Sequence, residues 1–148
     1  MFVQFADAAR IAGITEHQLK EWCMRRSLIA PDIQARGRGH NALFGWRALL
    51  ALRLLSVIHS RFGGTVAHWG PVLERFRCSI EAKSFPALFG HIAVFDGDKV
   101  QLRQSVDRGQ SEALILRLDD HLLAISRGLG SNDREIQLSL LPPLLVTR

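Results

Sequence analysis

The chain has 148 residues, of which 47% are hydrophobic and 22% charged, so it has the composition of an ordinary globular protein with enough apolar material for a core. No apolar run reaches the length of a membrane span, and the N-terminus lacks the basic and apolar regions of a secretion signal. The two cysteines, Cys23 and Cys78, are far apart in the sequence. We therefore expect a reduced, cytoplasmic protein without a disulfide framework.

The net charge of +5 belongs entirely to the first part of the chain. Up to Phe62 there are nine basic and four acidic residues, whereas from Gly63 onward ten basic residues meet ten acidic ones. A localised positive field attracts a polyanion and supports phosphate contacts. Charge by itself leaves open a basic surface that never touches nucleic acid.

Two short helices joined by a tight turn are predicted near the N-terminus, over residues 7–12 and from residue 15 to about residue 26. Gly13 can take the positive φ that ends the first helix. Thr15 is a natural N-cap, and Gln18, three residues later, completes a capping box. This pattern is typical of a helix-turn-helix.

A β-hairpin is predicted over residues 33–44, with its tip at residues 36–40. Pro31 ends the preceding helical region, and residues 2–4 form either a short leading strand or an extended lead-in. A hairpin placed after a helix-turn-helix is a wing. The basic side chains at its tip suit the minor groove or the phosphate backbone of DNA.

A helix over residues 46–62 is the most strongly predicted element, and its wide apolar face indicates burial on more than one side. Gly63 and Gly64 end it, and Thr65 caps a further helix that runs to about Lys83.

The rest of the chain predicts a small mixed region. Residues 91–103 form a hairpin that turns at Asp96-Gly97-Asp98. Residues 113–118 form a buried strand, followed by a helix over residues 120–127 that Asp119 caps and Gly128 ends; a single helix over residues 111–127 is the alternative. Residues 136–146 are expected to be an extended segment or a tail strand.

Several ordered landmarks follow one another over residues 3–62. They are Ala8-Ala9 through Gly13-Ile14-Thr15, Leu19-Lys20-Glu21-Trp22, Leu28-Ile29-Ala30-Pro31, Gly39-His40-Asn41-Ala42-Leu43-Phe44 and Trp46 through Leu52. With these landmarks, residues 3–62 resemble the winged helix-turn-helix of the MerR family. That family consists of bacterial DNA-binding transcription regulators, usually dimers, whose C-terminal part senses a metal or a small molecule. The chain departs from the family in having Ser27 where glycine is usual.

The resemblance implies double-stranded DNA as the partner, a homodimer, and RNA polymerase or another protein as a further partner. The beginning of the second helix would enter the major groove, the wing would lie on the backbone, and Arg47 would touch the backbone beyond it. A solvated helix face and a flexible basic turn are the plain alternatives. The expected DNA-binding residues are Thr15, His17, Gln18, Lys20, Arg25, Arg36, Arg38, His40, Asn41 and Arg47.

For an enzyme the sequence offers little. Gly128-Leu129-Gly130-Ser131 lacks the spacing and the lysine of a phosphate loop, and no HExxH, GxSxG or paired-cysteine motif occurs. Cys78 with His68 or His91 could bind a metal, but single thiols are more often idle. We expect no catalytic residue, no cofactor and no metal.

We therefore expect an α+β protein with a winged helix-turn-helix over residues 1–62, a connecting helix over residues 63–84, and a small α/β region over residues 85–148 for dimerisation or sensing. Its expected function is sequence-specific binding of duplex DNA as a nucleoid-associated transcription regulator. The alternatives are an excisionase-like, DNA-bending protein of a mobile element and a protein-interaction adaptor built on a winged helix.

Overall fold

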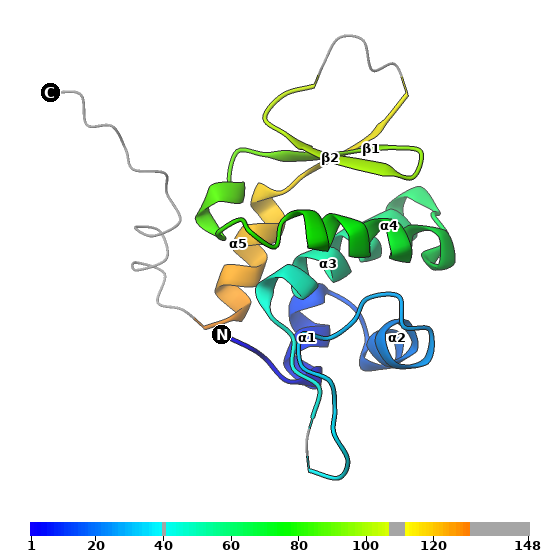
Figure 1. Cartoon of the computed structure of the whole chain (residues 1–148), viewed down its shortest axis with the longest axis vertical. Coiled ribbons are helices and arrows are strands. Elements are labelled where there is room, and N and C mark those ends of the chain that lie inside the picture. Colours follow the sequence, from blue (N-terminus) through cyan, green and yellow to red (C-terminus); the bar gives the residue numbers. More distant parts are fainter. Residues whose placement is uncertain (40, 107–111, 131–148) are drawn as a thin grey trace, which may run out of the picture.

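The computed structural model describes residues 1–39, 41–106 and 112–130, and shows a mixed helical and sheet protein of the α+β class (Figure 1). Within these residues, no helix is both long enough and apolar enough to cross a membrane. The elements in chain order are α1 (Phe5–Ala12), α2 (Glu16–Leu19), the π-helical η1 (Lys20–Arg25), α3 (Trp46–Phe62), α4 (Val66–Ser79), the 3₁₀ turn η2 (Pro86–Leu88), β1 (Ile92–Asp96), β2 (Lys99–Arg103), β3 (Leu114–Arg117) and α5 (Asp119–Gly128).

The central element is α3, whose bounds are those predicted from the sequence. Eight of its residues are buried, and α1, α4 and α5 all pack against it, as its wide apolar face predicted. It ends at Gly63, which has a φ of 67°. That left-handed conformation is inexpensive for a residue without a Cβ atom.

The three strands form one antiparallel sheet in the order β2-β1-β3. Asp96 pairs with Lys99, so the two turn residues are Gly97 and Asp98. Phe95 of β1 meets Trp69 and Phe76 of α4, with ring centroids 5.6 and 6.4 Å apart. These contacts fix the sheet over α4. The structure confirms a strand followed by a helix after residue 113 and excludes the single long helix. The strand was predicted to be buried, but β3 is only partly so, because Ile115 and Arg117 are exposed.

Two predictions about helix ends were wrong. The helix α4 ends at Ser79 and not near Lys83, and Pro71 lies inside it, beyond the first turn. Asp119 does not cap α5 but is its first residue. Its Oδ1 accepts a hydrogen bond from the amide of Gly90 at 2.8 Å, so the carboxylate secures the loop before β1 instead of a helix end.

One hydrophobic cluster runs from Ala8 in α1 to Ile125 in α5. Gly128 lies so close to Ile11 that a Cβ atom at position 128 would collide with that side chain. The core is thus continuous across the boundaries that we predicted after residues 62 and 84, and the division into domains stays a prediction. The segment 136–146 lies outside the described residues.

Candidate nucleic-acid interface

The connection between α1 and α2 has the local chemistry that the sequence predicted. Gly13 ends α1 with a φ of 73°, and its amide donates to the carbonyl of Arg10 at 3.2 Å. The capping box is complete, because the amide of Gln18 donates to Thr15 Oγ1 at 3.0 Å and the amide of Thr15 donates to Gln18 Oε1 at 3.1 Å. The backbone amides of Thr15 and Gln18 at the start of α2 therefore both have an acceptor.

We predicted a regular α-helix up to about Arg26, and this prediction was wrong. After Leu19 it widens into the π-helical segment η1, in which the amide of Arg26 reaches the carbonyl of Glu21 at 2.9 Å. It ends at Ser27, which has a φ of 52°, and the amide of Leu28 donates to the carbonyl of Trp22 at 2.8 Å. Ser27 is thus a residue with a Cβ atom in the left-handed conformation that usually favours glycine. Such π-helical turns are frequent at functional sites.

The helix formed by α2 and η1 has one buried and one exposed face. Leu19, Trp22 and Cys23 lie in the core. Burial, with a smaller contribution from the charge of Glu74, raises the pKa of the Cys23 thiol to about 12. The side chains of His17 and Lys20 lie on the exposed face and form no hydrogen bond or ion pair with any residue that the structure describes.

The loop between Ile33 and Leu43 projects from the end of the molecule opposite the sheet, the same end as α1 and α2 (Figure 1). The predicted hairpin strands are reduced to single bridges between Ile33 and Leu43 and between Val3 and Phe44. Arg36 and Arg38 are exposed, without a hydrogen-bond partner among the described residues. Asn41 is also exposed, and His40, which we predicted as a DNA contact, lies outside the described residues.

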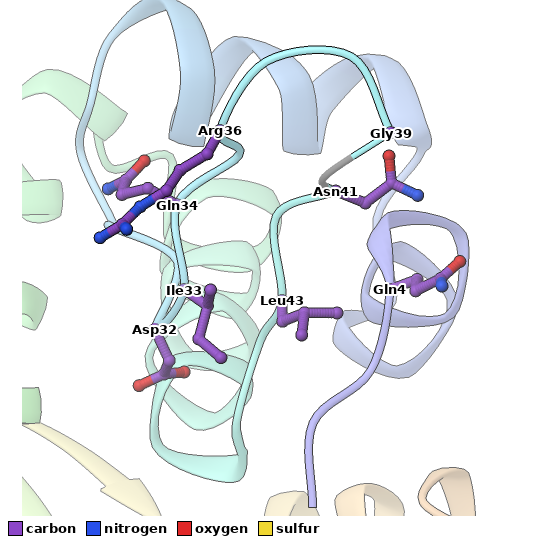
Figure 2. Close-up of a pocket in the computed structure, with 8 residues that line it drawn as sticks. All are labelled: Gln4, Asp32, Ile33, Gln34, Arg36, Gly39, Asn41 and Leu43. Atoms are coloured by element: carbon purple, nitrogen blue, oxygen red, sulfur yellow. The ribbon is translucent and has the colours of Figure 1, made fainter.

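A hollow of about 790 Å³ adjoins this loop. In Figure 2 the side chains of Gln34 and Arg36 extend in the same direction, whereas Asn41 points away from them. Sequence reasoning missed Gln34. Its spacing of two residues from Arg36 in an extended segment was the signal that could have found it, since alternate residues share a side.

The base of the loop is tied to α4 by a half-buried ionic cluster centred on Arg77. Its guanidinium donates to Asp32 Oδ1 at 2.7 Å and to Glu74 Oε1 at 3.2 Å, and also to the carbonyl of Ala30. The second oxygen of Asp32 accepts from the amide of Gly45 at 2.5 Å. Asp32, at the start of the loop, thus binds both Gly45, just after the end of the loop, and Arg77 of α4. These bonds hold the base of the loop against the core.

Besides Thr15 and Gln18 of the capping box, two basic residues among the expected DNA contacts have partners inside the protein. Arg25 forms an ion pair with Glu21 at 3.3 Å, on the exposed surface. Arg47 faces inward: its Nε and Nη2 donate to the carbonyls of Ile80 and Lys83 at 3.2 and 2.6 Å. Its guanidinium also lies 4.2 Å from the centre of the Trp46 ring. These contacts join the start of α3 to the end of α4, and the contact of Arg47 with a DNA backbone stays a prediction.

The aromatic residues at this end lie in the core or against it. Trp22 and Phe44 are buried, and Trp46 is half-buried against Phe85 with ring centroids 5.2 Å apart. These rings therefore pack in or against the core beneath the surface and are not exposed for stacking on DNA bases. Over residues 1–39, 41–106 and 112–130 there is no group of three or more metal-ligating side chains.

No protein-family model and no curated protein matches this chain. The resemblance to the MerR family therefore stays a prediction that depends on the residues quoted for it.

Proposed function

We propose that the chain is a duplex-DNA-binding transcription regulator, in which α1, α2 and the projecting loop act as a winged helix-turn-helix. The observation that carries this proposal is a set of three exposed cations, Lys20 at the start of η1 and Arg36 and Arg38 on the projecting loop. The helix α2, which η1 continues, and the loop lie at the same end of the molecule (Figure 1). None of the three pairs with a carboxylate in the described part of the chain. A cation left without an internal partner is available to neutralise a phosphate.

The exposed start of α2 would supply the contacts to base edges. The side chains of His17 and Lys20 have no partner among the described residues, and Lys20 can donate to a phosphate or to the O6 and N7 atoms of guanine. Gln18 is more restricted, because its Oε1 already accepts the amide of Thr15 at 3.1 Å. Its remaining donor, the NH₂ group, can reach an acceptor such as a purine N7. The paired contact that glutamine makes with adenine needs both groups, so the capping box disfavours it.

The loop would place Arg36 and Arg38 on the backbone or in the minor groove. For this task its base must keep a fixed position relative to α2, and two connections support that position. Asp32 and Ala30 bind Arg77 of α4, and Phe44 pairs with Val3, directly before α1. Proteins that contact DNA from two elements at once depend on such a rigid spacing.

The test is fluorescence anisotropy of the purified protein with the DNA upstream of its own coding sequence and with a scrambled duplex, over a series of salt concentrations. Neutralising Z phosphates gives a slope of about −0.9Z in a plot of log K against log salt, so three cations predict a slope of about −3 or steeper. Tighter binding to the upstream DNA with this slope supports an operator reader. Equal, weak binding to both duplexes, with a shallow slope, contradicts the proposal.

A further inference from the structure

A second concentration of positive charge lies away from the proposed DNA surface, in a cavity of about 330 Å³ between α3, β3 and α5. Arg53 and Arg61 of α3 and Arg117 of β3 line it, and Asp120 of α5 is the one carboxylate among the described residues of the lining. Two large apolar side chains also line the cavity and are well exposed, Phe62 at 58% and Ile115 at 37%. The cavity thus combines three cations with an apolar wall.

Two of these arginines have no partner in the part of the chain that the structure describes. Arg61 and Arg117 are exposed, and neither forms a hydrogen bond or an ion pair with a residue that the structure describes. Arg53 is engaged: its Nη1 donates to the carbonyl of Ile11 at 2.6 Å, and its Nε donates to Nδ1 of His121 at 3.2 Å. Arg53 therefore organises the floor of the cavity, while Arg61 and Arg117 remain available to a ligand.

The pKa of His121, which also lines the cavity, reflects the charges around it. Burial, and then the positive charge of Arg53, lower the pKa of His121 to about 4; Arg61 adds to this effect and Asp120 opposes it. Since Nδ1 accepts from Arg53, the neutral ring has its proton on Nε2. The cavity therefore holds an excess of positive charge without taking up a proton. Such an arrangement favours an anion.

We propose that this cavity binds a small organic anion, a carboxylate joined to an apolar body. The carboxylate would pair with Arg61 and Arg117, since a guanidinium can donate two parallel hydrogen bonds to its oxygens. The apolar body would lie against Phe62 and Ile115. The volume of about 330 Å³ is near the lower end of the range for small-molecule sites, about 300 to 1,000 Å³, so the ligand is small.

The cavity also has a physical connection to the other end of the molecule. The carbonyl that Arg53 holds belongs to Ile11, in the last turn of α1, two residues before the Gly13 turn. An anion that draws the guanidinium of Arg53 toward itself would weaken this hydrogen bond and change the position of α1. A ligand that binds two states differently shifts their equilibrium. This consequence, control of DNA affinity by the anion, rests on the function proposed above.

The site is tested by titration calorimetry of the full chain with benzoate and with octanoate, and with benzamide as the uncharged counterpart of benzoate. We expect saturable binding of one carboxylate per chain, and at least tenfold weaker binding of benzamide. Arg61→Gln with Arg117→Gln should weaken carboxylate binding at least tenfold. The matched control, Lys83→Gln with Arg127→Gln, removes two exposed cations outside the cavity and should leave the affinity unchanged.

Three results would overturn the proposed site: no saturable binding of either carboxylate, equal affinity for benzamide and benzoate, or an equal loss in the control variant. The coupling has its own measurement, DNA anisotropy with and without saturating benzoate or octanoate. A change in DNA affinity supports the coupling, and an unchanged affinity refutes it. If the protein binds a carboxylate but no DNA, the site stands and the proposed function fails.

Discussion

The basic residues of the interior and those of the projecting end differ in what they bind. Arg47, Arg53 and Arg77 donate to backbone carbonyls far away in the chain and so join elements together. Lys20, Arg36 and Arg38 have no such partner among the described residues. A positive charge is therefore available to a ligand only where the fold gives it no hydrogen-bond acceptor.

The largest expected effect comes from removing an interior arginine. Arg77 is 14% exposed and pairs with Asp32 and Glu74. Arg77→Met leaves one oxygen of each carboxylate and the Ala30 carbonyl without the guanidinium that donates to them, so we expect a loss of about 3 kcal/mol in the free energy of unfolding. Urea denaturation followed by circular dichroism measures it. Arg38→Met is the control and should change the stability by less than about 0.5 kcal/mol. Equal effects of the two variants would remove the distinction between interior and projecting cations.

The next effect depends on pH and concerns His121. Its pKa is about 4 in the folded protein and 6.5 in an ordinary environment, so between these values the unfolded chain binds a proton that the folded protein does not. The free energy of unfolding should therefore fall as the pH is lowered from 6.5 toward 4. His121→Gln, which keeps an acceptor for Arg53, should show a smaller dependence in the same window. Urea denaturation at several pH values compares them, and identical pH dependences would contradict the expected role of His121.

A smaller effect on stability should distinguish Thr15 from His17, two residues at the start of α2. Thr15 accepts the amide of Gln18, whereas the side chain of His17 has no hydrogen-bond partner among the described residues. Thr15→Ala should cost about 1 kcal/mol of stability by removing the N-cap. His17→Ala should leave stability unchanged and weaken DNA binding. Thermal unfolding and anisotropy measure the two quantities, and a large loss of stability in His17→Ala would show that this residue has a structural role instead.

The smallest effect should be a gain. Ser27 has a φ of 52°, a conformation that is strained for a residue with a Cβ atom. Ser27→Gly should raise the free energy of unfolding by about 0.5 to 1 kcal/mol, because relief of strain outweighs the greater freedom of glycine in the unfolded chain. Ser27→Ala keeps the Cβ atom and should bring no gain. Equal stabilities of the glycine and alanine variants in urea denaturation would contradict the strain.

Local signals in the sequence predicted the elements whose causes are themselves local. The bounds of α3, the glycine ends at Gly13 and Gly63 and the capping box of Thr15 all depend on residues within a few positions of each other. The same holds for the hairpin of β1 and β2, although its turn residues proved to be Gly97 and Asp98.

The features that the sequence did not predict have causes that are distant in the chain. Asp119 had the residue type of an N-cap, but its carboxylate binds the amide of Gly90, 29 positions earlier. The internal partners of Arg47 lie 33 and 36 positions later in the chain. The cavity that we propose to bind an anion is lined by residues of α3, β3 and α5. No local spacing in the sequence could indicate that these residues lie close together. The widening of η1 had no signal that we can identify.

The central claim is that the cations of the projecting end, and not the net charge as such, bind DNA. Two triple variants test it most directly. Lys20→Gln with Arg36→Gln and Arg38→Gln, and Lys83→Gln with Lys99→Gln and Arg127→Gln, each lower the formal net charge from +5 to +2. By anisotropy on the upstream DNA, the first variant should lose most of its affinity, with a salt slope shallower by about 3, while the second stays close to the unchanged protein. Equal losses in both variants would contradict the claim and leave only a general attraction between a basic protein and DNA.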